Sequence, residues 1–174
     1  MFKCGWRCVA MLCISVVIIV AGWLFWCGPH TTVLLVRHAD RDGNLDQLKA
    51  EGFVRAGVLA HVVDKAGLDA LIRSDAVRAQ QTAEPTATAE ALTPIVLTAN
   101  DVTAFVDEIR TNHRGQTVLV VGHSDTVPQI IAGLGGPAVT ITSTEFDNFY
   151  VLTLCRCRFG APRLTNLQYG APTN

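Results

Sequence analysis

The feature that most limits the fold of this chain is a pair of continuous apolar, β-branched runs, Thr32–Val36 and Thr117–Val121. Runs without polar alternation are typical of strands buried on both faces of a parallel sheet. The patterns around them alternate between helix and strand: helices are predicted over 46–66, 75–91, 101–113 and 126–134, and further strands over 70–72, 95–97, 148–156 and 163–168. This order predicts an α/β three-layer sandwich, with a mainly parallel central sheet flanked by helices.

Two of the predicted helices carry more detailed expectations. The helix over 46–66 has an apolar face made of Leu48, Phe53, Val54, Val58, Leu59, Val62 and Val63. Apolar residues at this spacing predict the face that packs on the sheet. The helix over 101–113 is expected to be capped by Asn100 or Asp101, because a short polar side chain at that position accepts a backbone N–H.

The N-terminus holds an uncharged and almost wholly apolar span from Cys8 to Gly28. About 20 apolar residues match the thickness of a bilayer core, so the span predicts one N-terminal transmembrane helix. A cleaved signal peptide is the alternative, but no small-residue cleavage pattern precedes Pro29. Lys3 and Arg7 before the span favour a cytoplasmic N-terminus. We therefore expect a single-pass membrane protein with an anchor at 1–28 and a periplasmic domain at 29–174.

Length and composition exclude several classes of protein. With 174 residues the chain is long enough for one domain, and a net charge of −1 gives no basis for nucleic-acid binding. The six cysteines do not form a disulfide framework, since four of them lie in or beside the apolar span. No His/Cys cluster has the spacing of a zinc site, so no metal and no cofactor are expected.

Positively charged side chains follow three of the predicted strands. Arg37 and His38 follow the first, Arg78 lies one turn into the helix after the second, and His123 follows the strand over 117–121. The carboxyl ends of parallel strands meet at one edge of a sheet, where ligands bind. Such a group of cations would repel itself unless an anion lay between its members. A phosphoryl group fits, because guanidinium groups bind its oxygens bidentately.

The motifs at these positions resemble those of one family. Leu35–Ala39 resembles the signature of the histidine phosphatase superfamily, which has the fold of the cofactor-dependent phosphoglycerate mutases. Arg78–Ala83 is similar to the second arginine motif of that family, and Val121–Ser124 to its second histidine motif. The resemblance covers roughly Val33 to Leu154, with the three motifs in the family's order. The short chain is similar to the small branch that includes bacterial phosphohistidine phosphatases.

The resemblance implies a role for each core residue. His38 would attack phosphorus as a neutral imidazole and become phosphohistidine. Arg37, Arg78 and a protonated His123 would bind the equatorial oxygens, and water would then hydrolyse the intermediate. The arginines would supply the positive charge that a metal supplies in other phosphatases.

Two further residues have alternative readings. Asp125, two residues after the second histidine, is either the general acid or the N-cap of the following helix. Asp101 and Glu84 are weaker candidates for the acid. Arg41 stands at the position of the third arginine of the acid phosphatase signature, but Gly43 replaces the proline of that signature. Arg41 is therefore either a phosphate ligand or a surface residue.

The sequence thus predicts a metal-independent phosphatase that acts on phosphomonoesters or phosphohistidine. Its expected partners are a small phosphorylated substrate or a phosphoprotein, and a membrane through the N-terminal helix. One alternative is a membrane-tethered protein that binds a phosphorylated ligand with weak catalysis or none. Another is a phosphomutase, although the chain lacks the substrate-enclosing insertions of the mutases.

Overall fold

A computed structural model of the chain describes residues 13–18, 22, 30–155 and 161–173. One six-stranded mixed sheet, in the order β3-β2-β4-β1-β5-β6, forms the centre of the domain. The elements are β1 (Thr31–Arg37), α2 (Ala50–Val63), β2 (Ala70–Ser74), α3 (Val77–Ala89), β3 (Ile95–Leu97), α4 (Val102–Asn112), β4 (Thr117–Gly122), α5 (Thr126–Gly133), β5 (Asn148–Leu154) and β6 (Arg163–Gln168).

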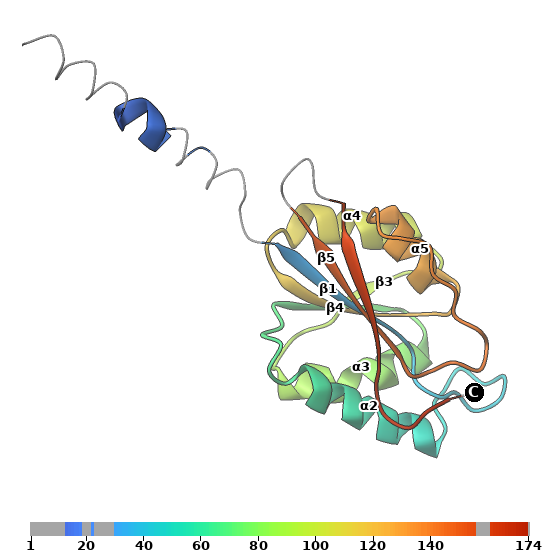
Figure 1. Cartoon of the computed structure of the whole chain (residues 1–174). Helices are drawn as coiled ribbons and strands as arrows, with labels where there is room; N and C mark the ends of the chain where they lie inside the picture. Colours follow the sequence, from blue (N-terminus) through green and yellow to red (C-terminus); the bar gives the residue numbers. More distant parts are fainter. Residues whose placement is uncertain (1–12, 19–21, 23–29, 156–160, 174) are drawn as a thin grey trace, which may run out of the picture.

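The four strands on one side of the sheet run parallel, and β5 and β6 add an antiparallel edge. Helices α4 and α5 cover one face of the sheet, and α2 and α3 cover the other (Figure 1). The arrangement fits the predicted three-layer sandwich. The late strand pairs with residues 163–168 as expected, and Asp101 is the N-cap of α4, accepting the backbone N–H of Ala104 at 3.0 Å.

The position of β1 inside the sheet explains why its segment Val33–Val36 is apolar. Val33 and Leu35 belong to the hydrophobic cluster that includes Phe105 of α4 and Ile130 of α5. Leu34 and Val36 point the other way, into the cluster that includes residues of α2 and α3. Successive side chains of a strand alternate between its two faces, so a strand covered on both sides has no position for a polar residue.

Helix α2 differs from its predicted packing. Phe53 and Val54 of the expected apolar face are 51% and 69% exposed, whereas Arg55 is buried. Leu48, Leu59 and Val63 of the expected face are buried as predicted, and the other buried residues of the helix are Gly52, Arg55 and Ala56. The partners that bury Arg55 lie far away in the sequence, so a local apolar pattern does not predict this orientation.

The predicted transmembrane anchor is wrong. Within the described residues, no helix is long and apolar enough to cross a membrane. Of the predicted anchor, residues 1–12, 19–21 and 23–28 lie outside the described residues.

The same finding overturns the location and the membrane partner predicted for the protein, a single-pass membrane protein with a periplasmic domain. The domain boundary predicted between residues 28 and 29 falls outside the described residues and stays a prediction.

Candidate active site

The predicted site residues meet at the carboxyl edge of three neighbouring strands. Strand β4 lies between β2 and β1, and Arg37 pairs with Gly122 at its end. The chain turns into loops directly after these strands, so the side chains that follow them lie at one edge. A cavity of about 410 Å³ opens there; it is lined by Arg37, His38, Arg41, Arg78, Ala99, Asn100, His123, Ser124, Asp125 and Ser143.

His38 lines this cavity and is held in one tautomer. Its side chain is buried, with the residue 3% exposed, and its backbone N–H donates to the carbonyl of Gly122 at 2.9 Å. Nδ1 lies 2.8 Å from the carbonyl oxygen of Ala39. A carbonyl only accepts, so Nδ1 carries the proton and Nε2 keeps its lone pair. Within the described part of the chain, no hydrogen-bond partner contacts Nε2.

The surroundings of His38 keep its imidazole neutral. Burial and, to a smaller extent, the charge of Arg37 together lower the pKa of His38 to about 3, against the opposing effect of the hydrogen bond to Ala39. A charged imidazolium is disfavoured both by removal from water and by neighbouring cations. The His38 ring is therefore neutral at neutral pH, which is the state that a nucleophilic imidazole requires.

His123 lies beside His38, with the two ring centroids 5.3 Å apart. The Nη2 of Arg78 lies 3.1 Å from Nδ1 of His123, and Ser74 Oγ lies 2.8 Å from Nε2. Because a guanidinium only donates, Nδ1 accepts, and a neutral His123 donates from Nε2 to Ser74. Burial, and then the charge of Arg78, lowers the pKa of His123. The sequence predicted a protonated His123, whereas this arrangement favours the neutral ring.

The end of β4 is shaped to hold His123. A Cβ placed on Gly122 would lie 2.9 Å from a methyl group of Val127, so only glycine lets α5 approach the strand this closely. The approach brings Thr126 Oγ1 to 3.0 Å from the backbone nitrogen of His123, whose N–H it accepts. The backbone of His123 is thus fixed as well as its ring.

Arg78, at the start of α3, is oriented from two sides. Its Nη1 forms an ion pair with Asp46 at 2.7 Å, while Nη2 contacts His123. Asp46 also accepts the backbone N–H groups of Val77 and Arg78, at 3.0 and 3.3 Å. Although burial opposes it, these hydrogen bonds lower the pKa of Asp46. Sequence reasoning missed this role of Asp46, because nothing in the local pattern connects it to a helix that begins 31 residues later.

Arg37 is held by the loop before β5. Its Nη1 donates to the carbonyl oxygens of Thr142, Ser143 and Glu145 at 2.8–3.0 Å, and its guanidinium carbon lies 3.9 Å from the ring centre of Phe146. Burial, and then the charge of Arg41, lowers the pKa of Arg37 to about 10, so it remains charged at neutral pH.

The two arginines still have unused hydrogen-bond donors. The Nε atoms of Arg37 and Arg78 are both buried, and neither has a partner in the described structure. Buried donors without an acceptor are costly, and the oxygens of a phosphoryl group bound in the cavity are of the kind that satisfies them.

Arg41 and Asp125 also line the cavity. Arg41 is half-buried, and its Nη2 contacts only Asn44 Oδ1, at 3.3 Å, among the described residues. Asp125 is exposed and is the N-cap of α5, where its Oδ1 accepts the N–H of Thr126 at 3.0 Å. The cap is present, and the position on the cavity wall leaves the acid role open. Arg73, within the last two residues of β2, donates to the carbonyl of Ser74 and is not among the described residues that line the cavity.

Over residues 13–18, 22, 30–155 and 161–173, no group of three His, Cys, Asp or Glu side chains is placed to hold a metal ion. The cations of the site are protein side chains.

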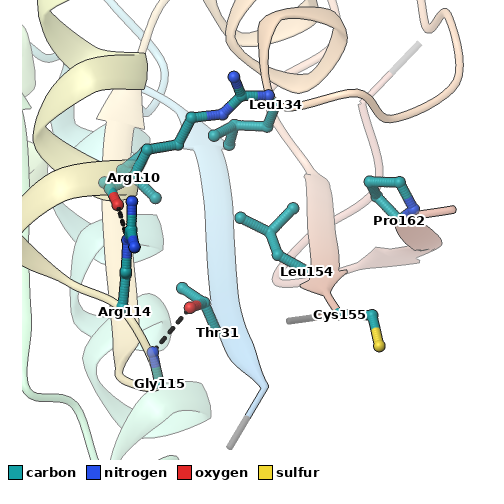
Figure 2. Close-up of a pocket in the computed structure, with 9 residues that line it drawn as sticks. Thr31, Arg110, Arg114, Gly115, Leu134, Leu154, Cys155 and Pro162 are labelled. Atoms are coloured by element: carbon teal, nitrogen blue, oxygen red, sulfur yellow. Dashed lines mark hydrogen bonds between the residues drawn. The ribbon is translucent and has the colours of Figure 1, made fainter. Parts of the chain in front are cut away.

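A second cavity, of about 320 Å³, lies at the opposite edge of the sheet, beside the start of β1 (Figure 2). Leu134, Leu154 and Pro162 form its apolar side, and Arg110 and Arg114 lie across from them. None of its nine described lining residues is a histidine or a carboxylate.

Comparison with known families gives one match. The sequence profile of the histidine phosphatase superfamily (branch 1) matches residues 33–100. This stretch contains Arg37, His38, Arg41 and Arg78, while His123 lies beyond it. No curated protein matches the sequence.

Solved structures share the fold at low sequence identity. The protein histidine phosphatase SixA in complex with tungstate is 23% identical, with a TM-score of 0.59 over 79% of this chain and 96% of that one. A mycobacterial glucosyl-3-phosphoglycerate phosphatase is 15% identical, with a TM-score of 0.60 over 80% and 99%. Phosphoserine phosphatase from Entamoeba histolytica, in complex with 3-phosphoglyceric acid, is 17% identical, with a TM-score of 0.59 over 82% and 98%. At these identities the likeness establishes the fold.

Proposed function

Because the chain belongs to the histidine phosphatase superfamily and is a histidine-type phosphatase, we propose that it transfers a phosphoryl group first to Nε2 of His38 and then to water. Its substrate is a small phosphorylated molecule or a phosphoprotein. Among these we propose phosphomonoesters and phosphohistidine, the second supported by the likeness to the protein histidine phosphatase SixA.

The observation that carries the mechanism is the hydrogen bond from Nδ1 of His38 to the carbonyl of Ala39. It leaves the Nε2 lone pair available without a separate base. As Nε2 bonds to phosphorus, the bond from phosphorus to the leaving group breaks, and the leaving group takes the electron pair. Water then attacks phosphorus, and the pair of the N–P bond returns to Nε2. One proton of the water ends on the leaving group and the other on inorganic phosphate.

Arg37 and Arg78 are proposed to bind the phosphoryl oxygens through donors that include their unpaired Nε atoms. Charge spreads over these oxygens in the transition state, where preorganised cations contribute most. His123, in its protonated form, is proposed to bind a phosphoryl oxygen beside them. A bound phosphate carries negative charge, so it offsets the charge of Arg78 and favours protonation of His123.

The test is covalent trapping on the full chain. After brief exposure to labelled phosphoramidate, the wild type should carry an acid-labile, alkali-stable label, and it should release p-nitrophenol from p-nitrophenyl phosphate. His38→Ala should lose both activities. His61→Ala is the matched control, because His61 is exposed on α2 and does not line the cavity. A wild type that binds phosphate but shows neither label nor turnover would be a binding protein instead.

A further inference from the structure

Hydrogen bonds fix the two peptides on either side of the one that joins Ala39 to Asp40. The backbone N–H of Ala39 donates to Thr82 Oγ1 at 2.9 Å, and the carbonyl of Asp40 accepts the N–H of Lys49 at 3.0 Å. The peptide between these two carries the Ala39 carbonyl, which accepts the Nδ1 proton of His38. The orientation of the peptide therefore decides which nitrogen of His38 carries the proton.

The side chain of Asp40 extends away from the cavity into a buried ion pair. Arg55 and Asp40 are 4% and 5% exposed, and two contacts join them: Nε to Oδ2 at 2.6 Å and Nη2 to Oδ1 at 3.4 Å. Although burial opposes it, the hydrogen bond and charge of Arg55 lower the pKa of Asp40. The two-point geometry restricts rotation of the carboxylate more than a single contact would.

The third guanidinium nitrogen of Arg55, Nη1, contacts the segment that follows β6. Nη1 donates to the carbonyl oxygens of Tyr169 and Ala171, at 3.0 and 2.9 Å. One guanidinium thus joins α2, the segment after His38 and the end of the chain. Because each of its three guanidinium nitrogens has a hydrogen-bond partner, the buried side chain of Arg55 has little freedom to move.

The close approach of α2 to this segment depends on Gly52. A Cβ at that position would lie 2.2 Å from the carbonyl oxygen of Asp40, a distance that no side chain can occupy. The helix therefore contacts the Ala39–Asp40 region through backbone as well as through Arg55.

Stability alone is a weak explanation for this pair. Replacing a buried ion pair by apolar residues of similar volume is often neutral or stabilising. Asp40 also lies two residues after His38, the proposed nucleophile, so the position of Asp40 affects the orientation of the His38 ring. We propose that the Asp40–Arg55 pair, completed by the carbonyls of Tyr169 and Ala171, positions the Ala39 carbonyl and so keeps His38 in the Nδ1-protonated, nucleophilic tautomer. Asp40 and Arg55 are positioning residues in this proposal, which rests on the proposed function for its effect on rate.

The experiment measures the tautomer directly. In the full chain with ¹⁵N-labelled histidine, nitrogen shifts distinguish Nδ1–H from Nε2–H rings, and the His38→Asn spectrum assigns the signal of His38. The wild type should show the Nδ1–H form. Asp40→Asn removes the charge and Arg55→Lys removes the two-point contact, so both variants should populate the Nε2–H form. Their kcat should fall on the order of tenfold to a hundredfold, as for a misplaced catalytic group, with KM within about twofold.

Two further variants separate positioning from folding. Asp40→Leu with Arg55→Met replaces the pair by apolar side chains and should fold, yet it should still show the altered tautomer and the low kcat. Lys65→Met removes the exposed ion pair of Lys65 with Asp64 and should change neither. If folded variants keep the Nδ1–H form and the wild-type kcat while only their melting temperatures fall, the pair is structural and the proposal is overturned.

Failure of the proposed function gives a different result. A wild type without turnover rejects that function, but it leaves the tautomer measurement in the variants to decide the positioning role by itself.

Discussion

The carboxylate of Asp46 lies 2.7 Å from Nη1 of Arg78, on the same guanidinium whose Nη2 lies 3.1 Å from the ring of His123. Arg78 is therefore fixed between a residue that precedes α2 and one that follows β4. Its remaining donor, Nε, is buried without a partner in the described structure. An arginine held in this way presents a defined direction to a ligand and loses less entropy when it binds one.

This relationship predicts that loss of Asp46 weakens substrate binding. We expect Asp46→Asn to raise KM several-fold, since one charge-assisted contact in a partly exposed position is worth about 1 kcal/mol. The asparagine oxygen can still accept the N–H of Val77, so the variant should remain about as stable as the wild type. Asp46→Ala also removes this cap of α3 and should cost about 1 kcal/mol of unfolding free energy. Steady-state kinetics and urea unfolding measure both effects; an unchanged KM in both variants would remove Asp46 from the site.

A second prediction concerns pH and stability. The folded state binds a proton on His38 only near pH 3, whereas an unfolded histidine binds one near its ordinary pKa of 6.5. Between these values the unfolded state holds more protons, so the contribution of His38 makes the protein less stable as pH falls. From pH 7 to pH 5 this loss should reach about 2 kcal/mol.

His38→Gln should remove that contribution. Urea unfolding at pH 7, 6 and 5 should show the variant gaining stability relative to the wild type as the pH is lowered. His61→Gln, at an exposed position on α2, serves as the control and should follow the wild type. Parallel pH profiles for wild type and His38→Gln would mean that His38 is not buried as a neutral ring.

The positions of the core site residues could be predicted because they depend on short-range patterns. An apolar run fixes where β1 and β4 end, and the parallel arrangement brings those ends together. Arg37, His38 and His123 follow directly from this reasoning. Arg78 follows as well, because it lies within the first turn of the helix after β2.

The supporting contacts could not be predicted, because each joins segments that are distant in sequence. Asp46 reaches α3, and Arg55 reaches both Asp40 and the C-terminal segment. Arg55 also shows why the apolar face of α2 was predicted only in part: Leu59 and Val63 are buried, but Arg55 is buried by distant partners while Phe53 and Val54 are exposed. The transmembrane helix was wrongly predicted from apolar composition alone, because no helix among the described residues is long and apolar enough to cross a membrane.

The third prediction concerns the source of positive charge. Because Arg37 and Arg78 line the cavity and retain unpaired donors, we expect turnover of p-nitrophenyl phosphate to be unchanged by EDTA. Vanadate, which resembles pentacoordinate phosphorus, should inhibit, and Arg78→Gln should weaken that inhibition by tenfold or more, on the order of one charge-assisted contact. Activity that EDTA abolishes and only a divalent cation restores would contradict this mechanism.

The last prediction concerns Asp125, whose carboxylate lines the cavity while its Oδ1 accepts the N–H of Thr126. This contact is the one that an N-cap side chain makes with the first turn of its helix. We therefore expect the N-cap role, in which Asn serves about as well as Asp. Asp125→Asn should keep kcat within about threefold for both p-nitrophenyl phosphate and an alkyl phosphate, well below the hundredfold or more that a general acid contributes.

The same reasoning predicts the leaving-group preference of the wild type. Asp125 is the one carboxylate among the described residues that line the cavity. Without its help, alkyl phosphates should be poor substrates, while phosphohistidine and aryl phosphates, whose leaving groups need less assistance, should be good ones. Asp125→Ala should cost about 1 kcal/mol of unfolding free energy through loss of the cap. A selective loss of alkyl phosphate turnover in Asp125→Asn, with p-nitrophenyl phosphate spared, would instead make Asp125 the general acid.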